Sequence, residues 1–213
     1  LDGQGVHVVD DMRYPISAGD VFVVQGELAH GFTDMQSLAL MNIIYSPERL
    51  HLPEEALRRL PGYHALFTLE PRYRRQHRFR SRLHLNPHEL TIVATLLESM
   101  QYELDARSPG YEVMALSQLL QLLTYVSRRY SDTDSAPSRA LLQVGQVISA
   151  IETRYAEPLT LETLAEMAHM SVNNLLLRFR QATGYSPIDY LIRVRIEHGA
   201  ALLRCGDSNI TEA

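Results

Sequence analysis

The stretch SVNNLLLRFRQATGYSPIDYLIRVRIEHGAALL, residues 171–203, decides the fold of the C-terminal part of this 213-residue chain. Ser171 is a typical N-cap, because its hydroxyl can accept from backbone N–H groups in the first turn of a helix. Leu175 and Phe179 follow at a spacing of four, so they lie on one face of that helix. Gly184 can adopt the left-handed conformation that ends many helices. The stretch therefore predicts a short amphipathic helix between Ser171 and Gly184, followed by a longer one.

A shorter helix is predicted immediately upstream. Thr160 suits its N-cap, residues 161–168 form the helix, and His169-Met170 makes the turn that follows. The side chains expected to face inward are Leu161, Leu164, Ala165 and Ala168. Two short helices joined by a tight turn are typical of a helix-turn-helix, although two helices crossing in a bundle give the same pattern. A further helix is predicted before them, over residues 141–155.

The same stretch resembles the AraC/XylS family of bacterial transcription regulators. The family pattern has a Ser, a spaced Leu and Phe, a basic residue, Thr-Gly-x-Ser-Pro, a Tyr, and an Arg-rich helix that ends Ala-x-x-Leu-Leu. The matching residues are Ser171, Leu175, Phe179, Arg180, Thr183, Gly184, Ser186, Pro187, Tyr190, Arg195, Ala200, Leu202 and Leu203. The resemblance implies two DNA-binding units joined by a long helix over residues 188–203. Residues 209–213 resemble the opening of the second unit, which is otherwise missing.

The resemblance also implies that the helix over residues 172–183 enters the major groove of double-stranded DNA. We expect DNA contacts from Ser171, Val172, Asn173, Asn174, Leu176, Leu177, Arg178, Arg180 and Gln181. Asn173, Leu176 and Leu177 would meet base edges, where Asn can bind adenine through two hydrogen bonds and Leu offers only apolar contact. The family often has Arg in place of Leu177, and packing against another domain is an alternative for both Leu residues. Phosphate contacts, which set register rather than sequence preference, suit Ser171, Asn174, Arg178 and Arg180.

The N-terminal part is predicted as short strands separated by Gly, Asp and Pro, over residues 6–9, 20–25 and 38–45. Residues 19–30, GDVFVVQGELAH, resemble the second motif of cupin barrels, in which the residue matching His30 can bind a metal. Gln25 stands where that motif has Pro, and a single His is weak support for a metal site. We therefore expect a hydrogen-bonded His, with no metal and no cofactor.

A small effector is expected in this N-terminal part. Residues 19–85 resemble the rhamnose-type branch of the family, which implies that the effector is a sugar. Polar side chains on the strands of a small barrel can point inward. On that basis the candidate effector-binding residues are His7, Gln25 and His30.

Residues 71–85 are dense in Arg, and the alternation in their second half predicts a strand with a basic face. The Arg cluster consists of Arg72, Arg74, Arg75, Arg78, Arg80 and Arg82. Three roles stay open for it. It can form ion pairs with acids such as Glu54, Glu55 and Glu103, contact DNA beside the main site, or bind an acidic effector.

The middle of the chain predicts a helical hairpin. Asn86 and Pro87 suit the N-cap and first position of a helix whose apolar stripe is Leu90, Val93, Ala94, Leu97, Met100 and Leu104. After Ser108-Pro109-Gly110, a second helix with a broader stripe is predicted over residues 111–130. The surplus of apolar positions allows a homodimer seam as well as packing within the chain. A short helix over residues 53–59, ended by Pro61-Gly62, is predicted upstream of the hairpin.

Charge and composition bound the possible partners. The formal net charge is −5, yet residues 171–204 hold five Arg against Asp189 and Glu197, a local net charge of +3. The single Cys205 excludes an internal disulfide framework and suits the cytoplasm, and no apolar run is long enough to span a membrane. The first residue is not Met and falls in a predicted strand, so we expect the gene product to extend upstream.

Together these patterns predict an α+β protein with a partial cupin-like β-barrel, a helical hairpin and an all-α helix-turn-helix domain whose second unit is truncated. The expected parts are an effector-binding domain over residues 1–86, a dimerisation hairpin over 87–130, a linker over 131–138 and a DNA-binding domain over 139–213. The expected function is sugar-responsive, sequence-specific transcription regulation by a homodimer, with RNA polymerase as a possible further partner. Two other classes stay open: a cupin-fold enzyme (isomerase or dioxygenase) with a helical extension, and an adaptor that dimerises through the hairpin without binding DNA.

Overall fold

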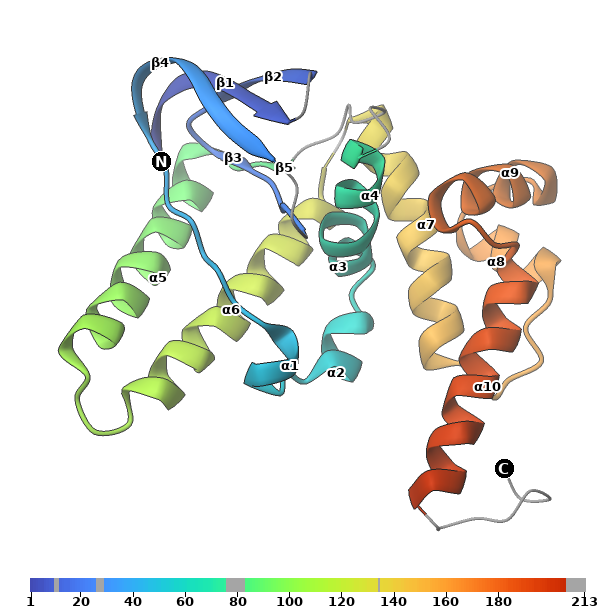
Figure 1. The fold of residues 1–213 in the computed structure, drawn as a ribbon. Helices are drawn as coiled ribbons and strands as arrows, with labels where there is room; N and C mark the ends of the chain where they lie inside the picture. The colour runs from blue at the N-terminus through green and yellow to red at the C-terminus, as the bar shows by residue number, and fades with distance from the viewer. Residues whose placement is uncertain (10–11, 26–28, 76–82, 134, 206–213) are drawn as a thin grey trace.

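A small antiparallel sheet lies at one end of a mainly helical chain, so the protein is α+β as predicted (Figure 1). The computed structural model describes residues 1–9, 12–25, 29–75, 83–133 and 135–205. A three-stranded sheet of order β2-β1-β4 is built from β1 (Asp2–Val9), β2 (Met12–Ser17) and β4 (His30–Ala39). A two-stranded sheet pairs β3 (Asp20–Val21) with β5 (Leu83–His84). The described strands form these two sheets and do not close into a barrel.

The strand predicted over residues 38–45 is wrong for most of its length. β4 ends at Ala39, and residues 40–45 lead as an irregular chain towards α1 (Pro47–Leu50) (Figure 1). The pairing ends there because Ala39 lies opposite Asp2, the first residue of β1. Leu40, Ile43 and Ile44 of this segment lie at the surface, and Ile44 is 95% exposed. The strand predicted over residues 20–25 is likewise reduced to β3.

A helical segment over residues 61–75 was not expected. α2 (Glu54–Arg58) agrees with the predicted short helix, but Pro61 then begins a new helix, a position where its missing N–H costs no hydrogen bond. The segment runs through α3 (Pro61–Tyr63), the π-helical turn η1 (His64–Leu69) and α4 (Glu70–Arg75). In η1 the Glu70 N–H donates to the carbonyl of Ala65, five residues back, which is the π pattern.

The Arg-dense stretch is therefore helical at its start and a strand at its end. Its first residues belong to α4, and β5 covers Leu83 and His84. The part of the predicted strand over residues 76–82, with Arg78, Arg80 and Arg82, lies outside the described residues.

The helical hairpin is formed by α5 (Pro87–Ala106) and α6 (Tyr111–Ser131), close to the predicted bounds. The Glu89 N–H donates to Asn86 Oδ1 at 3.0 Å and the Asn86 N–H to Glu89 Oε2 at 2.9 Å, so the predicted N-cap is confirmed as a full capping box. Val93 and Leu97 are buried as expected, whereas Leu104 is 47% exposed because the end of the hairpin extends beyond the core. Other apolar side chains exposed near this end are Tyr102, Val113 and Met114.

The C-terminal part consists of α7 (Ala136–Thr153), α8 (Leu161–Met167), α9 (Val172–Thr183) and α10 (Pro187–Cys205). α7 begins five residues before the predicted start, and the Ser138 N–H donates to its N-cap, Ser135 Oγ, at 3.2 Å. Residues 132–135 separate α6 from α7, and the rest of the predicted linker belongs to these helices.

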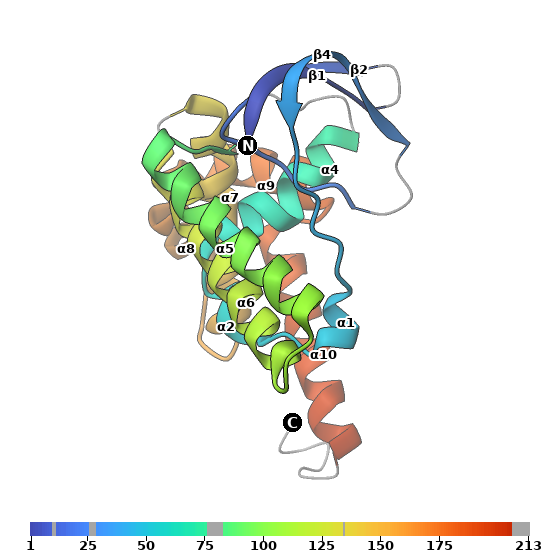
Figure 2. The same ribbon diagram turned by 90° about the vertical axis from the view of Figure 1, so that its left-hand side faces the viewer.

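One continuous apolar core joins the N-terminal half (β1 to α6) to the C-terminal half (α7 to α10). Buried members of this core are Leu69 of η1, Val126 of α6, Ile148 of α7 and Phe179 of α9. The packing of α9 is thus linked through α7 to the helices of the N-terminal half (Figures 1 and 2).

α3 lies directly between α6 and α7, and two glycines allow this close approach. A Cβ atom on Gly62 would lie 1.9 Å from the carbonyl oxygen of Ser127 in α6. A Cβ atom on Gly145 of α7 would lie 2.5 Å from the carbonyl oxygen of Pro61. Both distances are far below ordinary van der Waals contact, so the backbones meet only because neither residue has a side chain.

Candidate functional site

α8 and α9 meet at the tight turn that the sequence predicts. The Thr163 N–H donates to Thr160 Oγ1 at 3.2 Å, and the Asn174 N–H donates to Ser171 Oγ at 3.3 Å, so both predicted N-caps are confirmed. Between the helices, His169 adopts a φ of 51°, in the left-handed region where Gly is more common. Gly184 ends α9 with a φ of 86°, as predicted.

The core fixes the orientation of this helix pair. Leu164, Leu175 and Phe179 are completely buried, and the Phe179 ring meets the ring of Tyr190 edge-on at 5.6 Å between centroids. Ala165 and Ala168 are buried as expected, whereas Leu161 is only half-buried. Because one face of α9 is held in the core, its opposite face must point outward.

The outward face of α9 carries part of the predicted DNA-binding set. Asn173, Leu177, Arg180 and Gln181 are exposed, and Leu177 has 59% of its surface exposed. The more covered members of the set are Val172, Asn174, Leu176 and Arg178, which are half-buried. The exposed N-cap, Ser171, lies at the start of the same helix. Leu177 is therefore not buried by the residues that the structure describes.

The arginines of α9 and α10 differ in their contacts. Arg178 Nε donates to Asn174 Oδ1 at 2.9 Å, one turn earlier, which holds the guanidinium along α9. Arg180 is exposed and forms no ion pair with any residue that the structure describes. Arg193 lies over the ring of Tyr185, 4.6 Å from its centroid. Arg195 instead donates to backbone carbonyls after α7, at 2.7 and 2.8 Å, so it holds α10 in place.

A contact that the sequence did not indicate lies at the other end of α9. Arg72 of α4 donates through Nη1 to the carbonyls of Ala182 and Thr183, both at 3.0 Å. Arg72 belongs to the Arg cluster of the sequence, where nothing in the local pattern separates it from its neighbours. Two of the three acids suggested as partners of that cluster are used elsewhere, because Glu54 pairs with Arg58 and Glu55 with Arg59.

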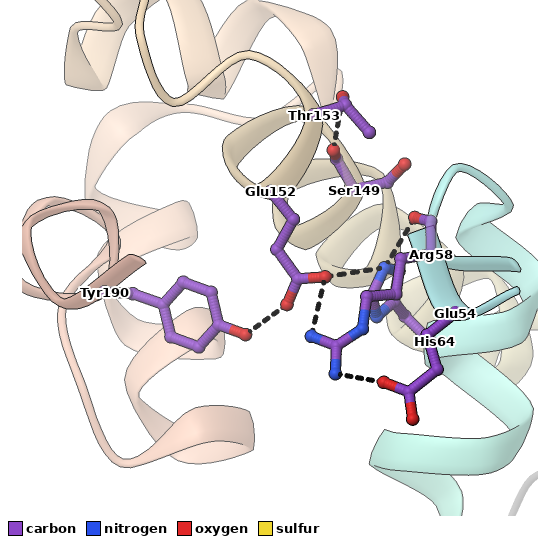
Figure 3. Close-up of polar contacts among 7 residues, drawn as sticks. All are labelled: Glu54, Arg58, His64, Ser149, Glu152, Thr153 and Tyr190. Atoms are coloured by element: carbon purple, nitrogen blue, oxygen red, sulfur yellow. Dashed lines mark hydrogen bonds and ion pairs between the residues drawn. The ribbon is translucent and has the colours of Figure 1, made fainter. Parts of the chain in front are cut away.

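A polar junction at Glu152 of α7 also joins the two halves (Figure 3). Tyr190 of α10 donates its hydroxyl to Glu152 Oε1 at 2.6 Å. On the opposite side, Arg58 Nη1 lies 3.4 Å and His64 Nε2 lies 3.7 Å from Glu152 Oε2. The Glu152 side chain is only 9% exposed, so these groups replace the water that a carboxylate needs. No motif in the sequence marks this junction, since its members come from α2, η1, α7 and α10.

Burial shifts the pKa of two members of the junction, His64 and Tyr190. It lowers the pKa of His64 below its ordinary value of 6.5, although the Glu152 carboxylate acts in the opposite direction. Burial, with the nearby Glu152 charge, raises the pKa of the Tyr190 hydroxyl. His64 is therefore neutral and Tyr190 remains a hydrogen-bond donor at neutral pH.

We expect the His64 shift to make stability depend on pH. The unfolded chain binds a proton at this residue near pH 6.5 and the folded chain only at lower pH, so stability is lost as the pH falls below about 6.5. The loss is at most about 1.4 kcal/mol per pH unit in that window. Chemical unfolding of the wild-type chain and of His64→Asn, at pH values from about 7.5 to about 5.5, measures this loss of stability. Equal slopes in the two proteins would contradict the shift.

The three candidate effector-binding residues are not all brought together. The buried His7 ring stacks between Phe22 and Phe32, at centroid distances of 4.5 and 5.0 Å, and the His30 ring meets it edge-on at 5.5 Å. Gln25 lies elsewhere, because its Nε2 donates to the carbonyl of Phe67 in η1 at 2.5 Å. His7 and His30 thus form one aromatic cluster, and Gln25 joins the N-terminal strands to the helical segment.

Two further observations limit the chemistry of the chain. In the part that the structure describes, no three His, Cys, Asp or Glu side chains lie together as ligands for one metal ion. No described helix combines the length and apolar character that crossing a lipid bilayer requires.

Comparison with known proteins gives relatives that span almost the whole chain. The HTH-type transcriptional activator RhaR of Salmonella arizonae is 30% identical over 212 residues, which cover 99% of this chain and 71% of the relative. The proteins of the same name from Salmonella schwarzengrund and Salmonella paratyphi B are each 29% identical over the same shares. No family model and no solved structure matches the chain.

Proposed function

Because this chain belongs to the AraC family of transcription regulators and is a DNA-binding regulator itself, we propose that α8 and α9 form its helix-turn-helix. In this proposal α9 lies in the major groove and is the recognition helix. The observation that carries it is the division of α9 into a buried face with Leu175 and Phe179 and an outward face with Asn173, Leu177 and Arg180. The relatives are named as activators of transcription, so the cupin-enzyme alternative is not favoured.

The outward face supports a division of roles. Asn173 lies near the N-terminal end of α9, where its amide can form two hydrogen bonds with an adenine edge. Leu177 lies one turn later and can contact a thymine methyl group. Arg180 and the N-terminal turn at Ser171 can bind phosphates, as exposed guanidinium groups and helix N-termini do. Arg178, held by Asn174, is oriented for a second phosphate.

Selection of genomic fragments tests the proposal. The full chain is mixed with sheared DNA of its host at moderate salt, and the bound fragments are sequenced. We expect enrichment of a few promoter regions with half-sites about one helical turn apart. Equal recovery of all fragments would overturn the proposal and favour the adaptor class.

We expect Asn173→Ala to change sequence preference without changing stability. Asn173 is exposed, so the free energy of unfolding should stay within about 0.5 kcal/mol of wild type. Loss of a two-bond contact should remove roughly 1–3 kcal/mol of discrimination at one base pair. Competition binding with a selected duplex and its single-base variants measures this, and Arg107→Ala at the distant hairpin loop is the control. An unchanged preference at every base pair would exclude Asn173 from base contact.

We further propose a sugar effector of the rhamnose type, bound near the His7–His30 cluster. The resemblance of residues 19–85 to the rhamnose-type branch supports the ligand class. His30 is exposed and His7 is buried against it, so His30 would contact the sugar and His7 would fix its orientation. Titration calorimetry of L-rhamnose into the full chain and His30→Ala tests this, and equal affinities would exclude His30.

The hairpin supports a homodimer, which we also propose. Tyr102, Leu104, Val113 and Met114 expose apolar surface at the end of α5 and the start of α6, where a second copy could cover it. Sedimentation of the chain and of Val113→Glu tests this, and a monomeric wild type would overturn it. Activation of transcription by a cytoplasmic dimer would further involve RNA polymerase, as in the expectation from the sequence.

A further inference from the structure

Arg72, in the N-terminal half of the molecule, donates hydrogen bonds to backbone carbonyls at the C-terminal end of α9. Its Nη1 donates to the carbonyls of Ala182 and Thr183, which are residues of the last turn. The last carbonyls of any helix lack partners within the helix and carry a partial negative charge. The Gly184 N–H donates to the carbonyl of Arg180, and so it does not pair with the carbonyls of Ala182 and Thr183. A guanidinium is therefore well suited to this position, both as a hydrogen-bond donor and as a cation.

The contact joins elements that are 110 and 111 residues apart in the chain. α4 ends the helical segment that begins at α3, and α3 lies directly against α7 at Gly145 and against α6 through Gly62. α3 and α9 lie on different sides of α7 (Figure 1). The buried face of α9 contacts the core, its outward face is free for DNA, and its C-terminal end contacts α4. Among the described side chains of α4, Arg72 is the one with hydrogen bonds to α9.

We propose that Arg72 is a positioning residue for DNA recognition, which couples the helical segment 61–75 to α9. This inference rests on the proposed function, because it assigns a regulatory contact to the same recognition helix. Arg72 holds the C-terminal end of α9 against α4, so the orientation of α9 depends on the position of α4. The dependence is reciprocal: DNA that fixes α9 must also stabilise the segment that Arg72 connects to it.

Hydrogen exchange of the full chain, with and without a duplex recovered in the genomic selection, tests this coupling. In wild type, DNA should slow exchange in α9 and also, by about fivefold or more, in peptides covering residues 61–75. Arg72→Met keeps the length and apolar stem of the side chain but removes the charge and the donors. We expect this variant to keep protection of α9 by DNA and to lose the effect of DNA on residues 61–75. Arg59→Met, which removes an exposed Arg of the same half, should behave as wild type.

The readout separates positioning from simple stabilisation. If Arg72 only stabilises the fold, Arg72→Met speeds exchange equally with and without DNA. The ratio of the exchange rate without DNA to the rate with DNA, for residues 61–75, then remains that of wild type. That result overturns the inference. A wild type in which DNA protects α9 but not residues 61–75 overturns it as well, without any variant, and leaves the proposed function intact. A wild type that binds no duplex removes the proposed function and this inference with it.

Discussion

Replacing Phe179 by Ala should lower the free energy of unfolding by about 3–5 kcal/mol, the range for truncating a buried aromatic side chain. Phe179 is completely buried, and its ring packs edge-on against Tyr190, which itself binds Glu152. The change leaves a cavity between α9 and α10 and weakens the support of the polar junction. DNA binding should fall together with stability, because the outward face of α9 depends on this anchor for its orientation.

Urea unfolding measures the loss, and Leu177→Ala on the opposite face of α9 is the matched control. Leu177 is 59% exposed, so its truncation should change the free energy of unfolding by no more than about 0.5 kcal/mol. A loss below about 1 kcal/mol for Phe179→Ala would mean that α9 is not anchored in the core as described. Comparable losses for both variants would contradict the assignment of the two faces.

Gly62→Ala should cost about 3 kcal/mol or more, which is large for the addition of one methyl group. The new Cβ would lie 1.9 Å from the Ser127 carbonyl oxygen and 2.8 Å from Ser131 Oγ. Relief requires movement of backbone, because the closest atom is not the end of a flexible side chain. α3 would have to move away from α6, and this movement is opposed on the other side by its close contact with Gly145 of α7.

Gly31→Ala is the control for this substitution, since no atom lies within 4 Å of the Cβ it would add. We expect that variant to stay within about 0.5 kcal/mol of wild type. Thermal or urea unfolding of both variants gives the comparison. A Gly62→Ala chain as stable as Gly31→Ala would show that α3 is not held between α6 and α7.

The helix ends were the most predictable part of the fold. Ser171, Thr160 and Asn86 were identified as N-caps because capping is local chemistry between a side chain and the backbone a few residues later. The buried face of α9 followed from the spacing of Leu175 and Phe179. The register also predicted Asn173, Leu176 and Leu177 on the outer face, where Asn173 and Leu177 are exposed and Leu176 is half-buried. The candidate DNA-binding face could therefore be found without knowing what the rest of the chain packs against.

The elements that were missed depend on distant contacts. Pro61-Gly62 was interpreted as the end of a helix, but Gly62 is required for the contact with α6 and Pro61 begins the next helix. The apolar residues 40–45 resemble a strand, yet β1 offers them no partner. Glu152 and Arg72 have no local signature, because their roles come from residues tens of positions away. Sequence periodicity describes one element at a time and carries no information on such pairs.

Because η1 is a π-helical turn, the number of residues in the segment 64–69 sets where Arg72 of α4 lies. A π turn holds one residue more than an α turn, because its N–H groups reach back five residues instead of four. Deleting one residue from η1 would replace the π turn by a shorter α turn and would change the position of Arg72 relative to the carbonyls at the end of α9. Surface loops tolerate small insertions and deletions, whereas this buried segment should not. Relatives that retain the Arg72 contact should therefore keep the spacing between Gly62 and Arg72 unchanged.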